Sequence, residues 1–225
     1  MDFTNNISNL IWNAVVAITA SAIAIFIPLD IIYNLRPEFN YISFALIASL
    51  IFTLDIVYKI LYRNRHLDPE FDDSLEIKSY LKTTFVFDFI AVIPFGILSD
   101  NSFLQLFSLV KLINIAIAMR QIKRREIRHV NAFSLLFFFY WIVHIAHWLA
   151  CGWLLLRDFD KNAPIFDSYL KSIYWTITTI TTIGYGDIYP VSDLARIVSV
   201  FFGLLGQLYL TIIMAFIIGK YLNRK

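Results

Sequence analysis

Long apolar runs, joined by short polar connections, are the feature that most constrains how this chain folds. Hydrophobic residues make up 59% of the 225 residues and charged residues only 16%. Soluble domains average about 45–50% apolar and about 25% charged residues, so an ordinary soluble domain is excluded. The low charge also excludes a disordered chain, a coiled coil and a basic nucleic-acid-binding domain. The composition therefore predicts an all-α membrane protein.

Six of the apolar runs are long enough to be membrane-spanning helices, because a hydrocarbon core about 30 Å thick needs about 20 residues. They cover residues 10–32, 41–62, 80–98, 103–119, 132–156 and 194–222. A seventh run, residues 168–180, is too short to cross and predicts a re-entrant helix. No basic residue precedes the first run, so we expect a retained span rather than a secretory signal.

The distribution of Lys and Arg predicts the orientation in the membrane. Six spans place both termini on one side, and most basic residues lie on that side, in residues 63–82, 120–128 and 220–225. Basic connections mark the cytoplasmic face. We therefore expect a multi-pass protein of the plasma membrane, specifically a prokaryotic inner membrane, with both termini in the cytoplasm.

A short motif after the seventh run carries the most specific functional signal. Its sequence is Thr182-Ile183-Gly184-Tyr185-Gly186-Asp187. Gly184 and Gly186 can adopt positive φ at little cost, which lets consecutive carbonyls from Thr182 to Tyr185 point the same way. Irregular backbone at membrane depth is tolerated only where it lines a water-filled path. The motif is therefore compatible with a non-helical segment that lines a water-filled path.

This motif resembles the selectivity filter of potassium channels, with Ile183 where the family commonly has valine. The resemblance implies that K⁺ ions bind the carbonyl oxygens of Thr182, Ile183, Gly184 and Tyr185 as they pass. One chain supplies one wall of such a cage. The resemblance therefore also implies a homotetramer with four-fold symmetry in the lipid bilayer, with no nucleic-acid partner.

Residues near the motif match the surroundings of that filter. Tyr174 and Trp175 stand where the family has paired aromatic residues packed behind the filter, and Thr179 belongs to the same supporting stretch. The family often has Trp at the first of these positions, where its indole holds the filter Asp. We expect the Tyr174 hydroxyl to bond Asp187 instead. The alternative is that the two rings anchor the helix at the membrane interface.

Two glycines, Gly203 and Gly206, lie in the middle of the last run. By its distance from the motif, Gly206 resembles the gating hinge of potassium channel inner helices. Glycine lowers the cost of a bend, which favours a hinge. Glycine also permits close helix packing, and this alternative stays open.

Charged residues inside the first four runs resemble those of a voltage-sensor domain. Buried charges in a bilayer are costly and usually paired, so they are functional candidates. The candidate set is Phe52, Asp55, Lys59, Asp88, Lys111 and Arg120. The alternative is a static bundle in which Asp55 and Lys59 neutralise each other at i, i+4.

A strong voltage sensor has a basic residue at every third position of its fourth span. Here only Lys111 lies deep in that run, and Arg120 lies at its cytoplasmic end. We therefore expect a sensor-like domain at residues 1–125 with weak voltage dependence. A pore domain is expected at residues 126–225.

Fragments outside the motif are similar to prokaryotic cyclic-nucleotide-gated potassium channels. They are Ile27-Pro28-Leu29, Ile93-Pro94-Phe95 and His147-Trp148-Leu149-Ala150-Cys151. This resemblance implies gating by cAMP or cGMP through a C-terminal domain beyond residue 225. The alternatives are a poorly selective cation channel and a voltage-gated potassium channel without a ligand domain.

Three other functional classes fit the sequence less well. A secondary transporter predicts inverted repeats, and a non-conducting membrane protein needs no filter. No nucleophile, base and orienting group lie together, so an enzyme is not predicted. His144, His147 and Cys151 share one face of the fifth run, and we interpret them as packing residues rather than metal ligands.

Overall fold

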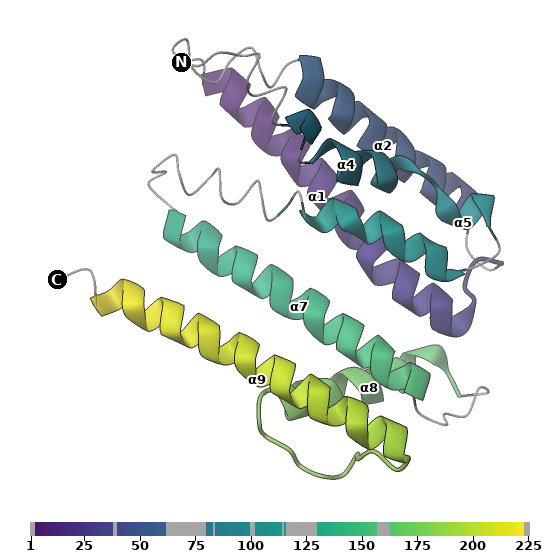
Figure 1. The fold of residues 1–225 in the computed structure, drawn as a ribbon, viewed down its shortest axis with the longest axis vertical. Coiled ribbons are helices and arrows are strands. Elements are labelled where there is room, and N and C mark those ends of the chain that lie inside the picture. Colours follow the sequence, from purple (N-terminus) through teal and green to yellow (C-terminus); the bar gives the residue numbers. More distant parts are fainter. Residues whose placement is uncertain are drawn as a thin grey trace. The chain divides into compact units, whose positions relative to one another are not determined.

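The computed structural model describes residues 3–37, 40–61, 80–82, 84–99, 102–113, 115, 130–156 and 163–222. Within these ranges the regular secondary structure is entirely helical (Figure 1). In chain order the helices are α1 (Phe3–Tyr33), α2 (Tyr41–Leu61), α4 (Phe85–Val92), α5 (Phe95–Leu98), η2 (Ser102–Lys111), α7 (Val130–Leu156), α8 (Ile165–Ile180) and α9 (Asp193–Leu222). The predicted all-α class is confirmed for this part of the chain.

Four of these helices contain segments that are long and apolar enough to cross a membrane. The segments are Ile11–Tyr33, Tyr41–Leu61, Leu136–Leu156 and Asp193–Ile212. They correspond to the first, second, fifth and sixth predicted spans. The predicted re-entrant helix is α8, which begins somewhat earlier than expected, at Ile165.

The third predicted span, residues 80–98, is not one continuous helix. A helical turn at residues 80–82 precedes α4, and α4 ends at Val92 before the short α5. Pro94 explains the second break, because proline lacks an amide donor and pushes the preceding residue out of helical geometry. Ile93 has φ −70° and ψ 119°, which is extended backbone. The expectation of a single helix over this run was therefore wrong.

The fourth predicted span, residues 103–119, also differs from expectation. Ser102–Lys111 forms the 3₁₀ helix η2, and helical residues at 112, 113 and 115 follow it. The rest of that run, with Arg120 beyond its end, lies outside the described residues. Long 3₁₀ segments are uncommon and usually depend on tertiary contacts.

The chain divides into two compact units, Met1–Tyr140 and Trp141–Lys225. The predicted domain boundary, between residues 125 and 126, falls outside the described residues. In the first unit, η2 packs against α1, α4 and α5, and α2 packs against α1 and α4. The buried stripe of α2 recurs every three or four residues and consists of Tyr41, Ala45, Ala48, Phe52, Asp55 and Lys59. One helix face therefore changes from apolar to charged along its length.

The second unit contains α8, α9 and the later part of α7. Its core is built around Trp153 of α7 and Trp175 of α8, whose rings stack 3.8 Å apart at 15°. Ala195 of α9 completes this core. The stack fixes α8 against α7, and α8 leads directly into the motif at residues 182–187.

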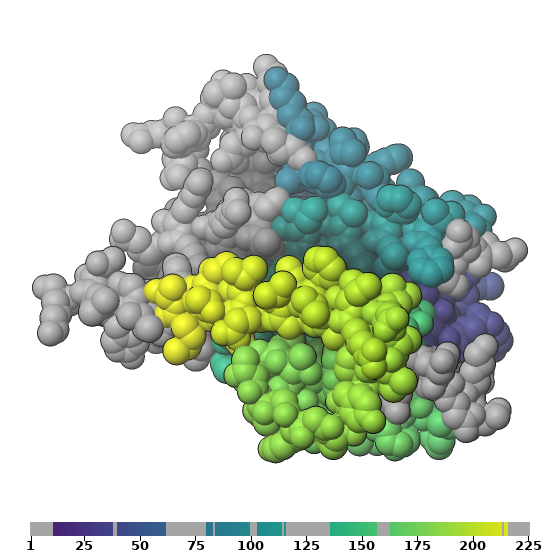
Figure 2. All heavy atoms as spheres, turned by 60° about the horizontal axis from the view of Figure 1, so that its bottom comes forward, coloured from purple at the N-terminus to yellow at the C-terminus, as the bar shows by residue number. Residues whose placement is uncertain are grey.

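A continuous face of α9 remains uncovered in the single chain. Figure 2 shows this helix in yellow-green to yellow, with its side chains at the surface. Its exposed large apolar residues are Leu194, Ile197, Val200, Phe201, Leu204, Leu205, Leu208, Ile212 and Met214. Such a face needs lipid or other protein chains to cover it.

Candidate functional site

The backbone of the predicted filter alternates in handedness. The φ angles of Thr182, Gly184 and Gly186 are 62°, 57° and 78°. The residues between them, Ile183 and Tyr185, do not have positive φ angles. Among the other described non-glycine residues, only Asn34 has a positive φ. This alternation turns successive peptide groups so that neighbouring carbonyls can face one side.

The end of α8 holds this segment by its amides. The amide of Thr182 donates to the Thr179 carbonyl at 3.1 Å, and the amide of Gly184 donates to the Thr178 carbonyl at 3.0 Å. Thr179 thus supports the segment through its backbone. Two amides of the segment are therefore bonded toward the end of α8.

The carbonyl oxygens of the segment have no protein donor. Within the part of the chain that the structure describes, no hydrogen bond reaches the carbonyls of Thr182, Ile183, Gly184 or Tyr185. Buried or membrane-embedded carbonyls normally require a partner. Residues 182–185 are exposed in the single chain, so these carbonyls are open to a ligand from outside the chain.

The glycines are required here by conformation rather than by space. A Cβ atom built on Gly184 or Gly186 meets no atom within 4 Å. An L-residue in the left-handed region costs about 1–2 kcal/mol, which glycine avoids. Substituting either residue therefore strains the backbone directly.

Tyr174 supports the segment in the predicted way. Its hydroxyl donates to Oδ2 of Asp187 at 3.0 Å, and its ring lies parallel to that of Tyr185, with centroids 6.3 Å apart. Trp175 points elsewhere: it is 5% exposed and stacks on Trp153. These contacts favour a supporting role for Tyr174, whereas Trp175 packs α8 against α7 and does not contact the motif.

The two glycines of α9 have different surroundings. A Cβ on Gly206 would lie 2.7 Å from Cβ and Cγ2 of Ile180, the last residue of α8, whereas one on Gly203 would meet nothing within 4 Å. α9 runs without a break through both. Gly206 is therefore needed for close packing of α9 against the end of α8, and a hinge role for either glycine stays a prediction.

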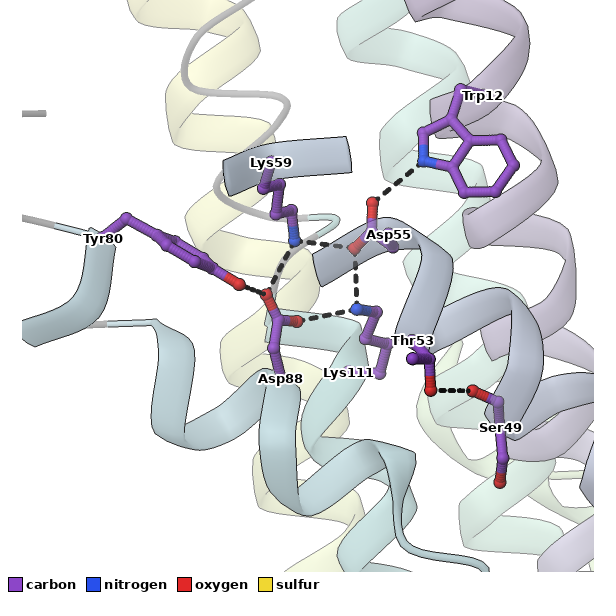
Figure 3. A network of polar contacts seen from close by, with 8 residues as sticks. All are labelled: Trp12, Ser49, Thr53, Asp55, Lys59, Tyr80, Asp88 and Lys111. Carbon is purple, nitrogen blue, oxygen red and sulfur yellow. Dashed lines mark hydrogen bonds and ion pairs between the residues drawn. The ribbon is translucent and has the colours of Figure 1, made fainter. Parts of the chain in front are cut away.

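A second candidate site lies in the first unit, where four buried charged side chains form a closed ring (Figure 3). Lys111 Nζ lies 2.7 Å from Oδ2 of Asp55 and 2.7 Å from Oδ1 of Asp88. Lys59 Nζ lies 2.8 Å from Oδ2 of each of the same two carboxylates. Two negative and two positive charges thus balance inside the helix bundle, as buried charges require.

Aromatic residues enclose the ring of charges. Lys111 Nζ lies 5.0 Å from the centroid of the Phe52 ring, and Phe52 is 0% exposed. Trp12 Nε1 donates to Oδ1 of Asp55 at 3.1 Å, and the Tyr80 hydroxyl donates to Oδ2 of Asp88 at 2.9 Å. Phe52 and the four charged residues were predicted as one set, and they contact one another in the structure. Arg120, the sixth member of the predicted set, lies outside the described residues.

Sequence reasoning missed Trp12 and Tyr80. Both carry a polar group that needs a partner when it is buried, which is a signal that could have drawn attention to them. Their partners could not be read from the sequence, because Trp12 and Asp55 are separated by 43 positions.

The residues of α7 interpreted as packing residues lie close to α8. His147 Nδ1 and the Tyr169 hydroxyl share a hydrogen bond of 2.9 Å, and the Cys151 sulfur lies 3.7 Å from His147 Nε2. His144 is 4% exposed. These contacts join α7 to α8 through polar atoms as well as through the stacked indoles.

Comparison with known proteins shows similarity to ion channels. Residues 127–223 match the sequence profile of a family described as an ion channel. This range contains α7, α8, the filter-like segment and α9. The match thus covers the second candidate domain rather than the whole chain.

Individual relatives extend the similarity into the first unit. The human voltage-gated delayed rectifier potassium channel KCNH5 is 25% identical over 252 residues, covering 89% of this chain and 25% of that protein. The potassium voltage-gated channel unc-103 of Caenorhabditis elegans is 26% identical over 207 residues, covering 72% and 24%. The voltage-gated inwardly rectifying potassium channel KCNH2 of Oryctolagus cuniculus is 22% identical over 244 residues, covering 88% and 21%. The chain spans about a quarter of the length of these curated relatives.

Proposed function

We propose that this chain is the subunit of a tetrameric channel that conducts K⁺ passively and selectively across a membrane. The observation that carries this proposal is the segment from Thr182 to Tyr185, whose carbonyls lack protein donors in the described structure. The ion channel match over residues 127–223 and the potassium channels among the relatives support it. The same matches point to a channel rather than an enzyme.

Selectivity follows from the way the segment is held. K⁺ must lose its hydration shell to enter, and rings of carbonyl oxygens replace that shell. The bonds from the amides of Thr182 and Gly184 to the end of α8 keep the carbonyls oriented. The C-terminal end of α8 carries a partial negative charge next to the segment, which also favours a cation.

A homotetramer is the arrangement that completes this site. Tyr185 is 69% exposed and Ile183 is 53% exposed in the single chain, although both are large and apolar. Four copies around an axis would surround the ion with carbonyls and cover these side chains. The exposed apolar face of α9 would then lie against neighbouring copies and lipid.

The first unit is proposed to be a sensor-like domain with weak voltage dependence. Lys111 is the one described residue of η2 that carries a positive charge. At about 2.3 kcal/mol per charge per 100 mV, one charge in each of four subunits supplies at most about 9 kcal/mol. Strongly voltage-gated channels, with three to four charges each, have about 28–37 kcal/mol.

Other parts of the proposal rest on the sequence alone. They are six spans, cytoplasmic termini in a prokaryotic inner membrane, bending at Gly203 or Gly206 during gating, and control by cAMP or cGMP. The relatives named above are described as voltage-gated, so a voltage-gated channel without nucleotide control is the second candidate. A poorly selective cation channel is the third.

The proposal is tested by ion flux in liposomes that contain the purified chain. We expect K⁺ flux at least tenfold faster than Na⁺ flux, and we expect Gly184→Ala to abolish it, because Ala disfavours the positive φ of 57°. Val191→Ala is the matched control, because Val191 follows the filter and is 75% exposed. The K⁺ flux through this variant should equal that through the parent chain.

Three outcomes separate the candidates. Equal K⁺ and Na⁺ flux would favour the poorly selective channel, and flux that changes on addition of cAMP or cGMP would show nucleotide control within residues 1–225. Flux that persists unchanged in Gly184→Ala would refute the assignment of residues 182–187 as the filter.

A further inference from the structure

A second polar cluster in the first unit lies near the other end of η2, away from the ring of buried charges. At its centre is Asp30 of α1, which is 1% exposed. Arg36 Nε donates to Oδ2 of Asp30 at 2.8 Å, and the Arg36 amide donates to Oδ1 at 3.1 Å. Gln105 Nε2 of η2 donates to the same Oδ2 at 3.0 Å. A buried carboxylate is thus bonded at once to a connecting segment and to η2.

Arg36 also reaches a third segment. Its Nη1 donates to the Gly96 carbonyl of α5 at 3.2 Å, and its guanidinium lies 5.3 Å from the centroid of the Tyr41 ring. A Cβ on Gly96 would overlap the Tyr41 hydroxyl and the Gln105 amide group. The close approach of α5 to this cluster therefore depends on glycine.

The 3₁₀ geometry of η2 aligns this cluster with the ring of charges. A 3₁₀ helix has about three residues per turn, so residues six apart lie on the same face, about 12 Å apart along the axis. An α-helix would rotate the second residue by about 240° away from the first. Gln105 and Lys111 are both buried, at 2% and 0% exposure, and each bonds to buried carboxylates. η2 is therefore held at two places on one face.

The bonding of Asp30 differs from that of Asp55 and Asp88 in one respect. The cation that neutralises Asp30 comes from Arg36, six positions along the same segment, and not from η2. η2 contributes only the uncharged amide of Gln105. A membrane potential exerts no net force on that amide, and Arg36 cannot move far from Asp30.

We propose that Asp30, Arg36 and Gln105 form a latch that fixes η2 along its axis, with Arg36 replacing a cation on η2. Movement of η2 by one 3₁₀ turn, about 6 Å, would break the bond of Gln105 to Asp30. The latch therefore restricts movement of η2 and keeps the voltage dependence of the first unit weak. This inference rests on the proposed membrane function, but its test does not require ion conduction.

The test moves the cation from the connection to η2 without changing the net charge. An environment-sensitive fluorophore is attached to Phe103→Cys, near the start of η2 and 59% exposed, after Cys151→Ala removes the one native cysteine. Fluorescence of the full chain in liposomes is recorded at 0 and −100 mV. The parent is compared with the exchange variant Arg36→Gln/Gln105→Arg.

We expect at most a weak voltage response in the parent chain and a much larger response in the exchange variant. One charge moving through the whole field shifts a two-state population by about fifty-fold per 100 mV, which sets the upper limit of the response. Gln105→Leu, which keeps the pair of Asp30 with Arg36, should show a smaller response carried by Lys111. Ser108→Ala, on the same face of η2, is the matched control and should behave like the parent.

Two results would overturn the latch. One is a parent response as large as that of the exchange variant, because η2 would then move with the latch intact. The other is an exchange variant that elutes as a normal tetramer but does not respond. Loss of K⁺-selective flux with these fluorescence results intact would refute the proposed channel and leave the latch supported.

Discussion

Lys111→Met removes one of the two ammonium groups from the ring of buried charges. Lys111 Nζ lies 2.7 Å from both Asp55 and Asp88, and its side chain is 0% exposed. After the substitution the two carboxylates share Lys59 alone, which leaves one negative charge without a partner inside the bundle. Removing one member of a buried ion pair costs about 3–5 kcal/mol. We expect the free energy of unfolding to fall by that amount.

A compensating substitution distinguishes charge balance from simple loss of packing. Asp88→Asn combined with Lys111→Met restores neutrality and leaves the pair of Asp55 with Lys59, whose atoms lie 2.8 Å apart. Coupling energies in such networks reach about 0.5–3 kcal/mol. We therefore expect the double variant to lose about 2 kcal/mol less than the sum of the two single variants.

Unfolding of the full chain by SDS in mixed micelles measures these free energies, and an exposed pair provides the control. Lys171 Nζ lies 2.7 Å from Oδ2 of Asp167, the same separation as in the ring, but the side chains are 53% and 49% exposed. Lys171→Met should cost at most about 1 kcal/mol. Equal costs for Lys111→Met and Lys171→Met, or strict additivity in the double variant, would refute the argument from buried charge.

Three further predictions concern the proposed pore. Tyr174→Phe removes the 3.0 Å hydrogen bond to Asp187 and should lower tetramer stability by about 0.5–1.5 kcal/mol while K⁺ selectivity in liposome flux is kept. Gly206→Ala places a Cβ 2.7 Å from Ile180, so thermal unfolding should show a loss of about 1–3 kcal/mol. Replacing K⁺ by a large organic cation should lower the melting temperature of the tetramer, since K⁺ at a hundredfold excess over its Kd contributes about 2.7 kcal/mol. Gly184→Ala should abolish this dependence on K⁺, and a dependence that survives the substitution would contradict binding at the filter.

The sequence predicted the elements whose signals are local. Apolar length located both ends of the second, fifth and sixth predicted spans within about two residues, but it missed the start of the first, because α1 already begins at Phe3. The spacing of Asp55 and Lys59 predicted their pairing, because residues four apart are neighbours on a helix. The third predicted span is not a single helix, because Pro94 breaks helical geometry although the run is apolar throughout most of its length.

The candidate sites also contain some features that local sequence predicts and others that depend on contacts between helices. The motif from Thr182 to Asp187 is contiguous, so its position could be found by its resemblance to a potassium channel filter, and the need for glycine follows from backbone preference. The choice between hinge and packing for Gly206 could not, since it depends on the position of Ile180, which lies on another helix.

By itself, the sequence determined that this chain is helical and membrane-like, where its filter-like segment lies, and which charged residues would need partners. Only the tertiary structure decided what those partners are. Gln105 bonds to Asp30 across 75 positions and Arg36 bonds to Gly96 across 60. Periodicity shows which face of a helix is buried, but the group that meets that face depends on how separate helices pack. The 3₁₀ form of η2 was likewise not predicted, and it brings Gln105 and Lys111 onto one face, where both bond to carboxylates of other helices.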